Sequence, residues 1–428
     1  MKNKKKLQKI SNVSNLNEHI LLLKTHNSRG ITLVALVVTI VVLLILAGVT
    51  ITMLFGENGI IKKAQEAKEA TERDQQETQQ GMQDLNDQMS TILNGNDGAR
   101  PVDVATLTTF VTENTEAVDI NGNKIVVPEG FKVLTSEGTT VQEGIVIQDE
   151  DGNEFVWIPV GTIKNADGST NTIELARYTF DITIDSDTGE ILGGTGAVKN
   201  KITDGSALND VGVSWEYLEE AATSTTYDNT KAKDIEGFKT SVSENGGYYI
   251  ARYEASYRDG TKPYSKASTG TPDDTDGSTI AAGMLWNWIT QPDAATASRN
   301  MYSSSSFESD LVNSYAWDTT IVFIQTYGDS DYSMQTSLNS TLGNTGTRSD
   351  GTTDKVCNIF DMASNTVEWT TETSTDTSGN PAYPCVERGG NYDNSDINTY
   401  TAFRSSLTAT SSHINFSFRV VLYVNQQH

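Results

Sequence analysis

The sequence has little cysteine, proline and histidine: among 428 residues there are 2, 8 and 4. Cys357 and Cys385 allow one disulfide, and two free buried thiols are the open alternative. The four histidines are scattered, and no GxSxG, HExxH or P-loop motif occurs. Paired acids such as Glu219 and Glu220 are typical of a solvated face. The sequence therefore predicts no catalytic residue.

Basic residues are also scarce outside the N-terminus. Residues 1–30 hold seven Lys or Arg and one acid, whereas the other 398 residues hold 24 basic and 55 acidic side chains. So acidic a chain repels phosphates, and we expect no nucleic-acid partner. The 34 glycines, the few prolines and the abundant Thr, Ser, Asn and Asp favour many short strands joined by turns over a helix bundle.

Residues 31–55 form an apolar run of 25 residues without a charge. A helix of this length spans a hydrocarbon core of about 30 Å, and a buried core helix is the alternative. Because the basic segment precedes the run, the positive-inside rule places residues 1–30 in the cytoplasm and everything after Phe55 outside. We therefore expect a single-pass cell-membrane protein with an extracellular C-terminal domain.

The start of this run, SRGITLV at residues 28–34, resembles the N-terminus of type IV prepilins and pseudopilins. The resemblance implies cleavage after Gly30, methylation of Ile31 and pilin-like assembly partners. In that family a glutamate five residues into the mature chain pairs with a neighbour's amino terminus during filament assembly. Ala35 stands at that position here. This departure is compatible with cleavage and argues against assembly into a true pilus.

The rest of the chain divides into three parts. Apolar residues spaced by three and four predict a helical stalk over residues 56–95, packed on the domain, paired with another copy, or solvated. A linker and β-region is predicted at 96–149, and an α+β, irregular and β-rich domain at 150–428, with an insertion near 162–242. Strands are predicted at 124–127, 144–148, 154–159, 248–253, 358–361 and 416–424, and helices at 293–301 and 314–327.

Four stretches of this domain resemble the formylglycine-generating enzyme and sulfatase-modifying-factor family. They are FVWIP at 155–159, GYYIARYE at 247–254, NIFDMASNTVEW at 358–369 and RGGNY at 388–392, followed by Arg404 and by FRVV at 418–421. The resemblance implies a C-type-lectin-like fold. It also implies two copper-binding cysteines just after Arg-Gly-Gly, where this chain has Asn394 and about Thr399. Neither supplies a soft thiolate for Cu(I), so we expect a catalytically empty domain, not an enzyme.

The same resemblance implies a structural Ca²⁺ at a turn. Carried over position by position, its ligands are the carboxylates of Asp361 and Glu368 and the backbone oxygens of Ser364 and Thr366. Hard oxygen ligands of this kind suit Ca²⁺. The alternative is that Asp361 caps a turn and Glu368 meets an arginine.

Arginines and glycines near the C-terminus have expected roles that need no resemblance. Arg388, Arg404 and Arg419 occur near apolar residues in an acidic domain. We therefore expect them to pair bidentately with buried carboxylates such as Glu368. The Gly389-Gly390 pair permits positive φ and a close approach of another backbone segment.

Residues 391–415 are unusually polar: 18 of the 25 are Asn, Asp, Ser, Thr, Tyr or His, and none is Lys, Glu or Gln. Such mixtures are typical of antigen-combining loops. The stretch is also similar to the variable proteins of diversity-generating retroelements, whose C-terminal positions form a ligand surface on a lectin-like fold. An ordinary polar C-terminus is the alternative. The predicted ligand-binding residues are Tyr392, Asp393, Asn394, Asp396, Asn398, Tyr400, Thr408, Thr410, Ser412 and His413.

These observations favour a membrane-anchored, surface-displayed protein that binds an extracellular protein or glycan. The first alternative is a minor pilin or pseudopilin of a type IV pilus or secretion filament. The second is a sulfatase-modifying-type oxidase whose metal site lies elsewhere in the chain.

Overall fold

The computed structural model describes residues 101–185, 188–209, 215–220, 230–337, 341–346, 354–376, 384–393 and 399–425, and four N-terminal residues. The chain divides into two units, Met1–Arg100 and Pro101–His428. In the first unit Val38, Ile40, Val41 and Val42 are helical and exposed. The predicted cleavage site at Gly30 and Ile31, the rest of the apolar run and the stalk lie outside the described residues. Within the described part, no helix is both long and apolar enough to cross a membrane.

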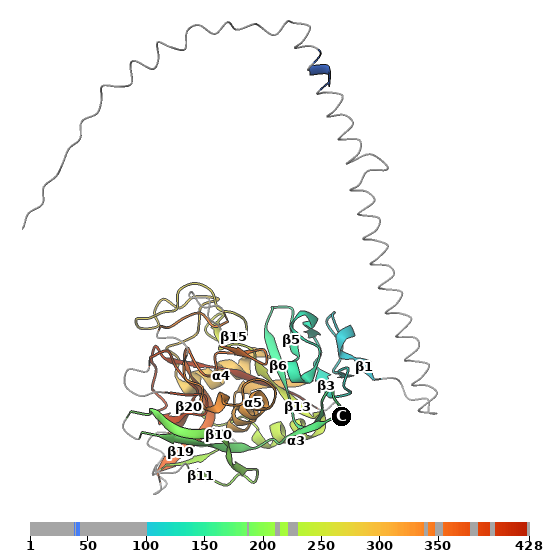
Figure 1. Cartoon of the computed structure of the whole chain (residues 1–428). Helices are drawn as coiled ribbons and strands as arrows, with labels where there is room; N and C mark the ends of the chain where they lie inside the picture. The colour runs from blue at the N-terminus through green and yellow to red at the C-terminus, as the bar shows by residue number, and fades with distance from the viewer. Residues whose placement is uncertain are drawn as a thin grey trace, which may run out of the picture. The chain divides into compact units, whose positions relative to one another are not determined.

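An antiparallel sheet with the order β16-β23-β13-β6-β5-β4 forms the first sheet of the second unit (Figure 1). Its strands are β4 (Lys132–Val133), β5 (Val146–Gln148), β6 (Glu154–Pro159), β13 (Gly247–Ala251), β16 (Phe307–Leu311) and β23 (Val420–Val424). β13 and β23 are buried along their whole length. A strand covered on both faces has no need to alternate apolar with polar residues, which explains the continuous run VVLYV. The predicted boundary between 149 and 150 falls between β5 and β6, which pair directly.

A second sheet is built mostly from the C-terminal part of the chain. Its order is β11-β12-β19-β20-β21, and β22 runs parallel to β19. The strands are β11 (Leu208–Asn209), β12 (Trp215–Leu218), β19 (Val367–Asp376), β20 (Cys385–Arg388), β21 (Arg404–Leu407) and β22 (Phe416–Phe418). The strand predicted at 416–424 is interrupted at Arg419, so that β22 joins the second sheet and β23 the first. This short segment therefore ties the two sheets together.

The other described strands form a three-stranded sheet and four hairpins. The three-stranded sheet holds β1 (Val102–Asp103), β2 (Thr115–Val118) and β3 (Lys124–Val127). The hairpins are β7 (Gly161–Lys164) with β8 (Thr170–Ile173), β9 (Arg177–Ile184) with β10 (Ile191–Ile202), β14 (Ser256–Tyr257) with β15 (Pro263–Tyr264), and β17 (Lys355–Val356) with β18 (Ile359–Phe360). The predicted insertion near 162–242 therefore includes two complete hairpins. β11 and β12 also come from it but belong to the second sheet.

Three α-helices are described in the second unit: α3 (Ile235–Asn245), α4 (Gln291–Met301) and α5 (Ser314–Tyr327). The bounds of α5 are those predicted, and its N-cap Asn313 accepts a hydrogen bond from the N–H of Ala316. α4 begins two residues before the prediction because Thr290 caps it. The predicted irregular insertion runs to residue 242. This prediction is wrong for its last part, because residues from Ile235 onward form α3. Asp234 at its N-cap and Gly246 at its C-cap mark this helix in the sequence.

Five buried side chains form what we call the charge network: Arg177, Arg388, Arg404, Asp318 and Glu372. Arg388 lies 2.6 Å from Asp318 and 3.4 Å from Glu372. Arg404 pairs with the same two acids, and Arg177 lies 2.9 Å from Glu372. Burial would raise the pKa of Glu372, but Arg404, Arg388 and Arg177 hold it at about 2. The network joins β9, α5, β19, β20 and β21, and it confirms that Arg388 and Arg404 pair with buried carboxylates.

A second buried pair joins the two sheets. Arg419 lies between β22 and β23, and its guanidinium donates to both oxygens of Glu368, at 2.6–3.2 Å. It also donates to the carbonyls of Ala251 and Phe360. The predicted pairing of Arg419 with Glu368 is therefore confirmed, and it fixes the chain where it passes from one sheet to the other.

Glu372→Gln should destabilise the domain strongly, because it leaves three buried arginines facing one carboxylate. Breaking a buried pair in this way costs about 3–5 kcal/mol, which urea unfolding measures. The matched control is Glu220→Gln. It removes a surface pair with Lys231 in which 47% of the glutamate side chain is exposed, and we expect a loss of less than about 1 kcal/mol. Equal losses in the two variants would contradict a structural role for the network.

Candidate ligand-binding surface

The turn after β20 brings the predicted binding segment against the body of the domain. Gly389 has φ 88°, and a Cβ there would lie 2.7 Å from the carbonyl oxygen of Met362. A Cβ on Gly390 would lie 2.0 Å from the carbonyl oxygen of Ala363. Side chains are therefore excluded at both positions, which confirms the predicted close backbone approach. The glycine pair sets the direction in which the chain leaves the sheet toward Tyr392.

The loop that follows is closed at its base. The N–H of Asn391 donates to the hydroxyl of Thr399 at 2.8 Å, and the N–H of Tyr392 donates to the carbonyl of Asn365 at 3.0 Å. Tyr392 is half-buried and Asp393 is exposed. Three of the predicted binding residues, Asn394, Asp396 and Asn398, lie outside the described residues. The structure thus brings the two ends of the loop together.

Tyr400 is placed differently from an exposed contact residue, since only 8% of it is accessible. It lines a cavity of about 130 Å³ together with Phe180, Phe403 and Arg404. Its ring lies edge-on to Phe403, with the ring centroids 5.8 Å apart. Tyr400 therefore packs against Phe403 and faces the same cavity as Phe180 of the β9–β10 hairpin.

Two of the remaining predicted residues, Ser412 and His413, contact Trp288, a tryptophan that the sequence did not single out. The rings of Trp288 and His413 lie 5.6 Å apart, and the hydroxyl of Ser412 donates to the carbonyl of Trp288 at 2.7 Å. The indole N–H of Trp288 donates to the carbonyl of Asp273. Trp288 is half-buried and has φ 53°, an unusual backbone conformation for a tryptophan. Backbone strain of this kind is concentrated at functional sites.

The loop that contains Asp273 accepts a hydrogen bond from the indole of Trp288, and the charge of Asp274 in the same loop acts on Tyr392. Burial raises the pKa of Tyr392, and the charges of Asp393 and Asp274 raise it further. Asp273 organises its loop by accepting hydrogen bonds from the N–H and hydroxyl groups of Thr275 and Thr279. We call the residues of these segments the C-terminal surface. Its described members are Asp274, Trp288, Tyr392, Asp393, Thr408, Thr410, Ser412 and His413.

Sequence reasoning missed Asp274 and Trp288 because their local patterns carry no binding signal. They precede the polar C-terminal segment by more than a hundred residues, and only the fold brings them to it.

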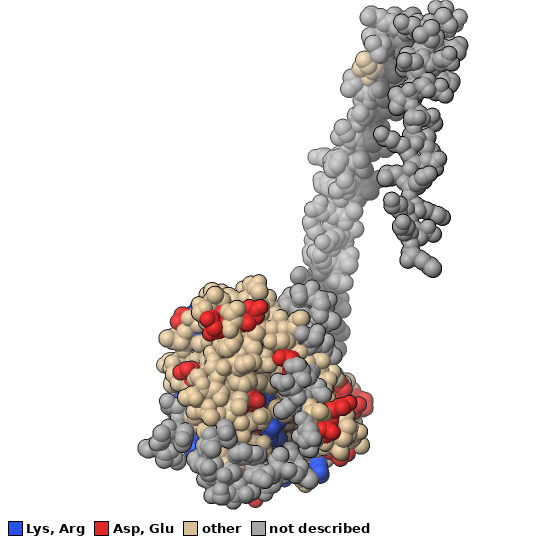
Figure 2. All heavy atoms as spheres, turned by 90° about the vertical axis from the view of Figure 1, so that its left-hand side faces the viewer, with Lys and Arg blue, Asp and Glu red and all other residues tan. Residues whose placement is uncertain are grey.

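On the face drawn in Figure 2, acidic side chains occur in small groups separated by large uncharged areas.

Both cysteines and Thr399, one of the two positions where copper ligands were expected, lie among the described residues. Cys357 and Cys385 are free, and burial raises the pKa of each thiol to about 12. The two free thiols correspond to the second of the two predicted alternatives. Thr399 offers a buried hydroxyl that already accepts from Asn391, and Asn394 lies outside the described residues. A hydroxyl oxygen does not suit Cu(I), so the residue at this position does not fit a copper site.

Two residues of the predicted calcium set, Asp361 and Ser364, lie at one buried turn. Asp361 has φ 64°, and its carboxylate accepts from the hydroxyl of Thr345 at 2.9 Å and from the N–H of Gly346 at 3.0 Å. The hydroxyl of Ser364 donates to Asp354 at 3.0 Å. Asp361 therefore organises the turn through neutral donors, as the alternative interpretation expected.

The other two residues, Glu368 and Thr366, contact Arg419 and Glu254. Arg419 engages both oxygens of Glu368, which leaves the carboxylate poorly placed for a cation. The N–H of Thr366 donates to the buried Glu254 at 3.0 Å. Burial raises the pKa of Glu254 well above its usual range, and the nearby Asp361 and Glu368 add to the effect. Calcium at this turn stays a prediction that calorimetric titration with CaCl₂ can test.

No family model matches the sequence, and no curated protein matches it. Among solved structures, the Major Tropism Determinant P3c variant is 13% identical, with a TM-score of 0.28 over 76% of this chain and 98% of that one. CarF is 12% identical, with a TM-score of 0.30 over 63% and 100%. PvdO from Pseudomonas aeruginosa is 9% identical, with a TM-score of 0.30 over 62% and 98%. Likenesses this weak establish neither a shared fold nor a shared function.

Glu219, which follows β12, and Glu387 of β20 are buried and have raised pKa values. Burial raises the pKa of Glu219 to about 7, although it accepts hydrogen bonds from Ser314 and Thr371. The expectation that Glu219 lies on a solvated face is therefore wrong. Burial raises the pKa of Glu387 to about 8. Among the described residues, one carboxylate oxygen of Glu387 has no hydrogen-bond partner.

The domain should lose stability as the pH rises from about 5 to 8.5. The folded state favours protonated Glu387, whose pKa of about 8 exceeds the usual value of 4.5. Its stabilising effect is therefore complete below pH 4.5 and is lost as the pH approaches 8. Glu387→Gln should remove this part of the loss, on the order of a few kcal/mol. Urea unfolding of wild type and variant at both pH values measures it, and parallel pH profiles would contradict the assignment.

Proposed function

We propose that this protein is a ligand-binding protein displayed at the cell surface. The apolar residues 31–55 anchor it in the membrane, the acidic C-terminal domain lies outside, and the C-terminal surface contacts an extracellular protein or glycan. This function needs no catalytic group and no bound metal. It also accounts for the polarity of residues 391–415, which a purely structural C-terminus would not require.

The observation that carries the proposal is the position of Trp288. A half-buried tryptophan in a strained conformation lies against His413, with its indole N–H donated to the Asp273 loop. Tryptophan and tyrosine dominate binding energy at protein interfaces, because a large rigid ring loses little conformational entropy when it is covered. Trp288 and Tyr392 supply two such rings within one polar surface.

The scaffold beneath this surface supports the same conclusion. The charge network and the Gly389-Gly390 turn fix both strands that flank the loop, β20 and β21. Binding surfaces are often carried by loops held on a rigid framework, since the framework limits the entropy lost on binding. The domain has this arrangement at its C-terminal surface.

Display outside the cell predicts a defined protease pattern. Proteinase K added to intact cells should remove the domain that begins at Pro101, whereas residues 1–30 stay protected until the membrane is permeabilised. Immunoblots with tags at the two ends of the chain measure this. Recovery of the intact chain in the cytosolic fraction would contradict the proposed anchoring.

Reducing the ring at Trp288 and removing the ring at Tyr392 should weaken binding. The purified full chain is tested on a panel of intact cells and on immobilised glycan and protein arrays. For any probe that wild type binds, Trp288→Phe with Tyr392→Ala should weaken binding at least about 30-fold, the effect of losing hot-spot contacts worth about 2 kcal/mol. The matched control is Phe110→Ala, which removes an exposed ring from another region.

Unfolding measurements show that each variant is folded before binding is compared. Unchanged binding in the Trp288 and Tyr392 double variant, for every probe that wild type recognises, would contradict the proposed surface.

A further inference from the structure

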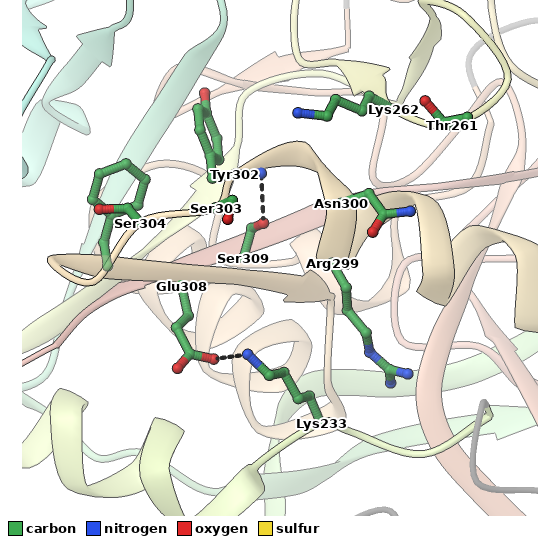
Figure 3. A pocket seen from close by; sticks show the side chains of 11 residues that line it. Lys233, Thr261, Lys262, Arg299, Asn300, Tyr302, Ser303, Ser304, Glu308 and Ser309 are labelled. Carbon is green, nitrogen blue, oxygen red and sulfur yellow. Dashed lines mark hydrogen bonds and ion pairs between the residues drawn. The ribbon is translucent and has the colours of Figure 1, made fainter.

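A cavity of about 410 Å³ lies where the C-terminal end of α4 meets β16 (Figure 3). Its walls come from Arg299 to Ser304, from Phe307 to Ser309, from the turn at Thr261 and Lys262, and from Lys233 before α3. None of these residues belongs to the C-terminal surface. A volume of this size falls within the range of ligand pockets, about 300–1,000 Å³. The cavity is therefore large enough for a small molecule.

Three cationic side chains border this cavity, and two of them are neutralised locally. Lys233 lies 2.6 Å from Glu308, and Arg299 lies 2.8 Å from the buried Asp310. Lys262 reaches into the cavity from the opposite wall (Figure 3). Among the residues that the structure describes, Lys262 has no carboxylate partner. The cavity thus holds one surplus positive charge on a chain whose net charge is −25.

The polar lining has hydrogen-bonding capacity to spare. Within the described part of the chain, the amide of Asn300 and the hydroxyl of Ser303 make no protein hydrogen bond, and both side chains are exposed. An amide and a hydroxyl each donate and accept, as the hydroxyl groups of a sugar require. By contrast, the hydroxyl of Ser309 already accepts a hydrogen bond from the N–H of Tyr302 and donates one to the carbonyl of Ser298. Asn300 and Ser303 are therefore two lining residues whose polar groups can bind a ligand in the same cavity as Lys262.

One wall of the cavity is held rigidly. The ring of Tyr302 lies 5.3 Å from that of Phe307, and its hydroxyl donates to Asp149 at 2.7 Å. Arg299 is fixed by Asp310 and by the carbonyl of Lys231. A preformed wall lowers the entropic cost of binding. Only Lys262 and the exposed polar groups need to adjust to a ligand.

From these observations we propose that the cavity is a second binding site, which takes a hydroxylated organic anion: an acidic sugar or a sugar phosphate. Lys262 attracts the anionic group, and Asn300 and Ser303 bind hydroxyl groups. An apolar ligand is disfavoured because the lining is mainly polar, and a neutral sugar would leave the ammonium of Lys262 without a counter-charge. The site is independent of the C-terminal surface and of its ligand.

The test uses the purified full chain and four probes: glucuronate, glucose 6-phosphate, glucose and inorganic phosphate. Binding is measured by calorimetry and by ligand-observed NMR. We expect one or both sugar anions to bind with a dissociation constant of about 1 mM or lower, and more tightly than glucose or phosphate. The sugar anion that binds more tightly shows whether the site prefers a carboxylate or a phosphate group. Lys262→Gln should weaken its binding at least about tenfold, because a charge-assisted contact is lost.

Two variants separate a local effect from a general one. Lys262→Arg keeps the charge in place and should bind within about threefold of wild type. Lys124→Gln removes one positive charge from an exposed pair with Glu116 elsewhere and should leave binding unchanged. The proposal is overturned if neither sugar anion binds, if glucose binds as tightly, if phosphate alone binds as tightly, or if Lys124→Gln weakens binding as much as Lys262→Gln.

Discussion

The placement of three arginines and two acids inside the domain is the constraint on which the rest of the C-terminal region depends. Arg177, Arg388 and Arg404 cannot be buried unless Asp318 and Glu372 reach them, because an unpaired buried charge costs several kcal/mol. The five residues come from β9, α5, β19, β20 and β21. A shift of any one strand by a single residue would turn its charged side chain to the other face of the sheet. The network therefore fixes the register of these strands as well as the positions of the buried charges.

Fixed register explains how a polar, irregular segment can form part of a defined surface. The chain leaves β20 through two glycines that lie against the backbone of Met362 and Ala363, and it returns to β21 at Arg404. Between these points Thr399 closes the loop base and Tyr400 packs against Phe403. The described residues at the two ends of the loop, 391–393 and 399–400, are held by hydrogen bonds and ring packing.

Much of this framework could be predicted from local sequence. β3, β6 and α5 have the predicted bounds because their apolar patterns, caps and turns are local signals. Pairing of the arginines was predictable as well. A buried guanidinium needs a carboxylate partner, and the domain is rich in acidic residues. The identity of the partners was not, because Asp318 lies in a helix that otherwise resembles a simple buried helix. Glu219 was misjudged for the same reason: its burial depends on Ser314 and Thr371, which are about 95 and 152 residues away.

The two proposed sites differ in their electrostatics, and this difference bears on what each can bind. At the C-terminal surface the charges of Asp274 and Asp393 act on Tyr392, so an anionic ligand meets repulsion unless it brings compensating groups. At the cavity near α4, Lys262 is the charge without a partner among the described residues, and an anion is attracted. One small acidic ligand is therefore poorly suited to both places. A partner recognised by Trp288 and Tyr392 and an anion held by Lys262 would occupy the domain together rather than compete, because neither site uses a residue of the other.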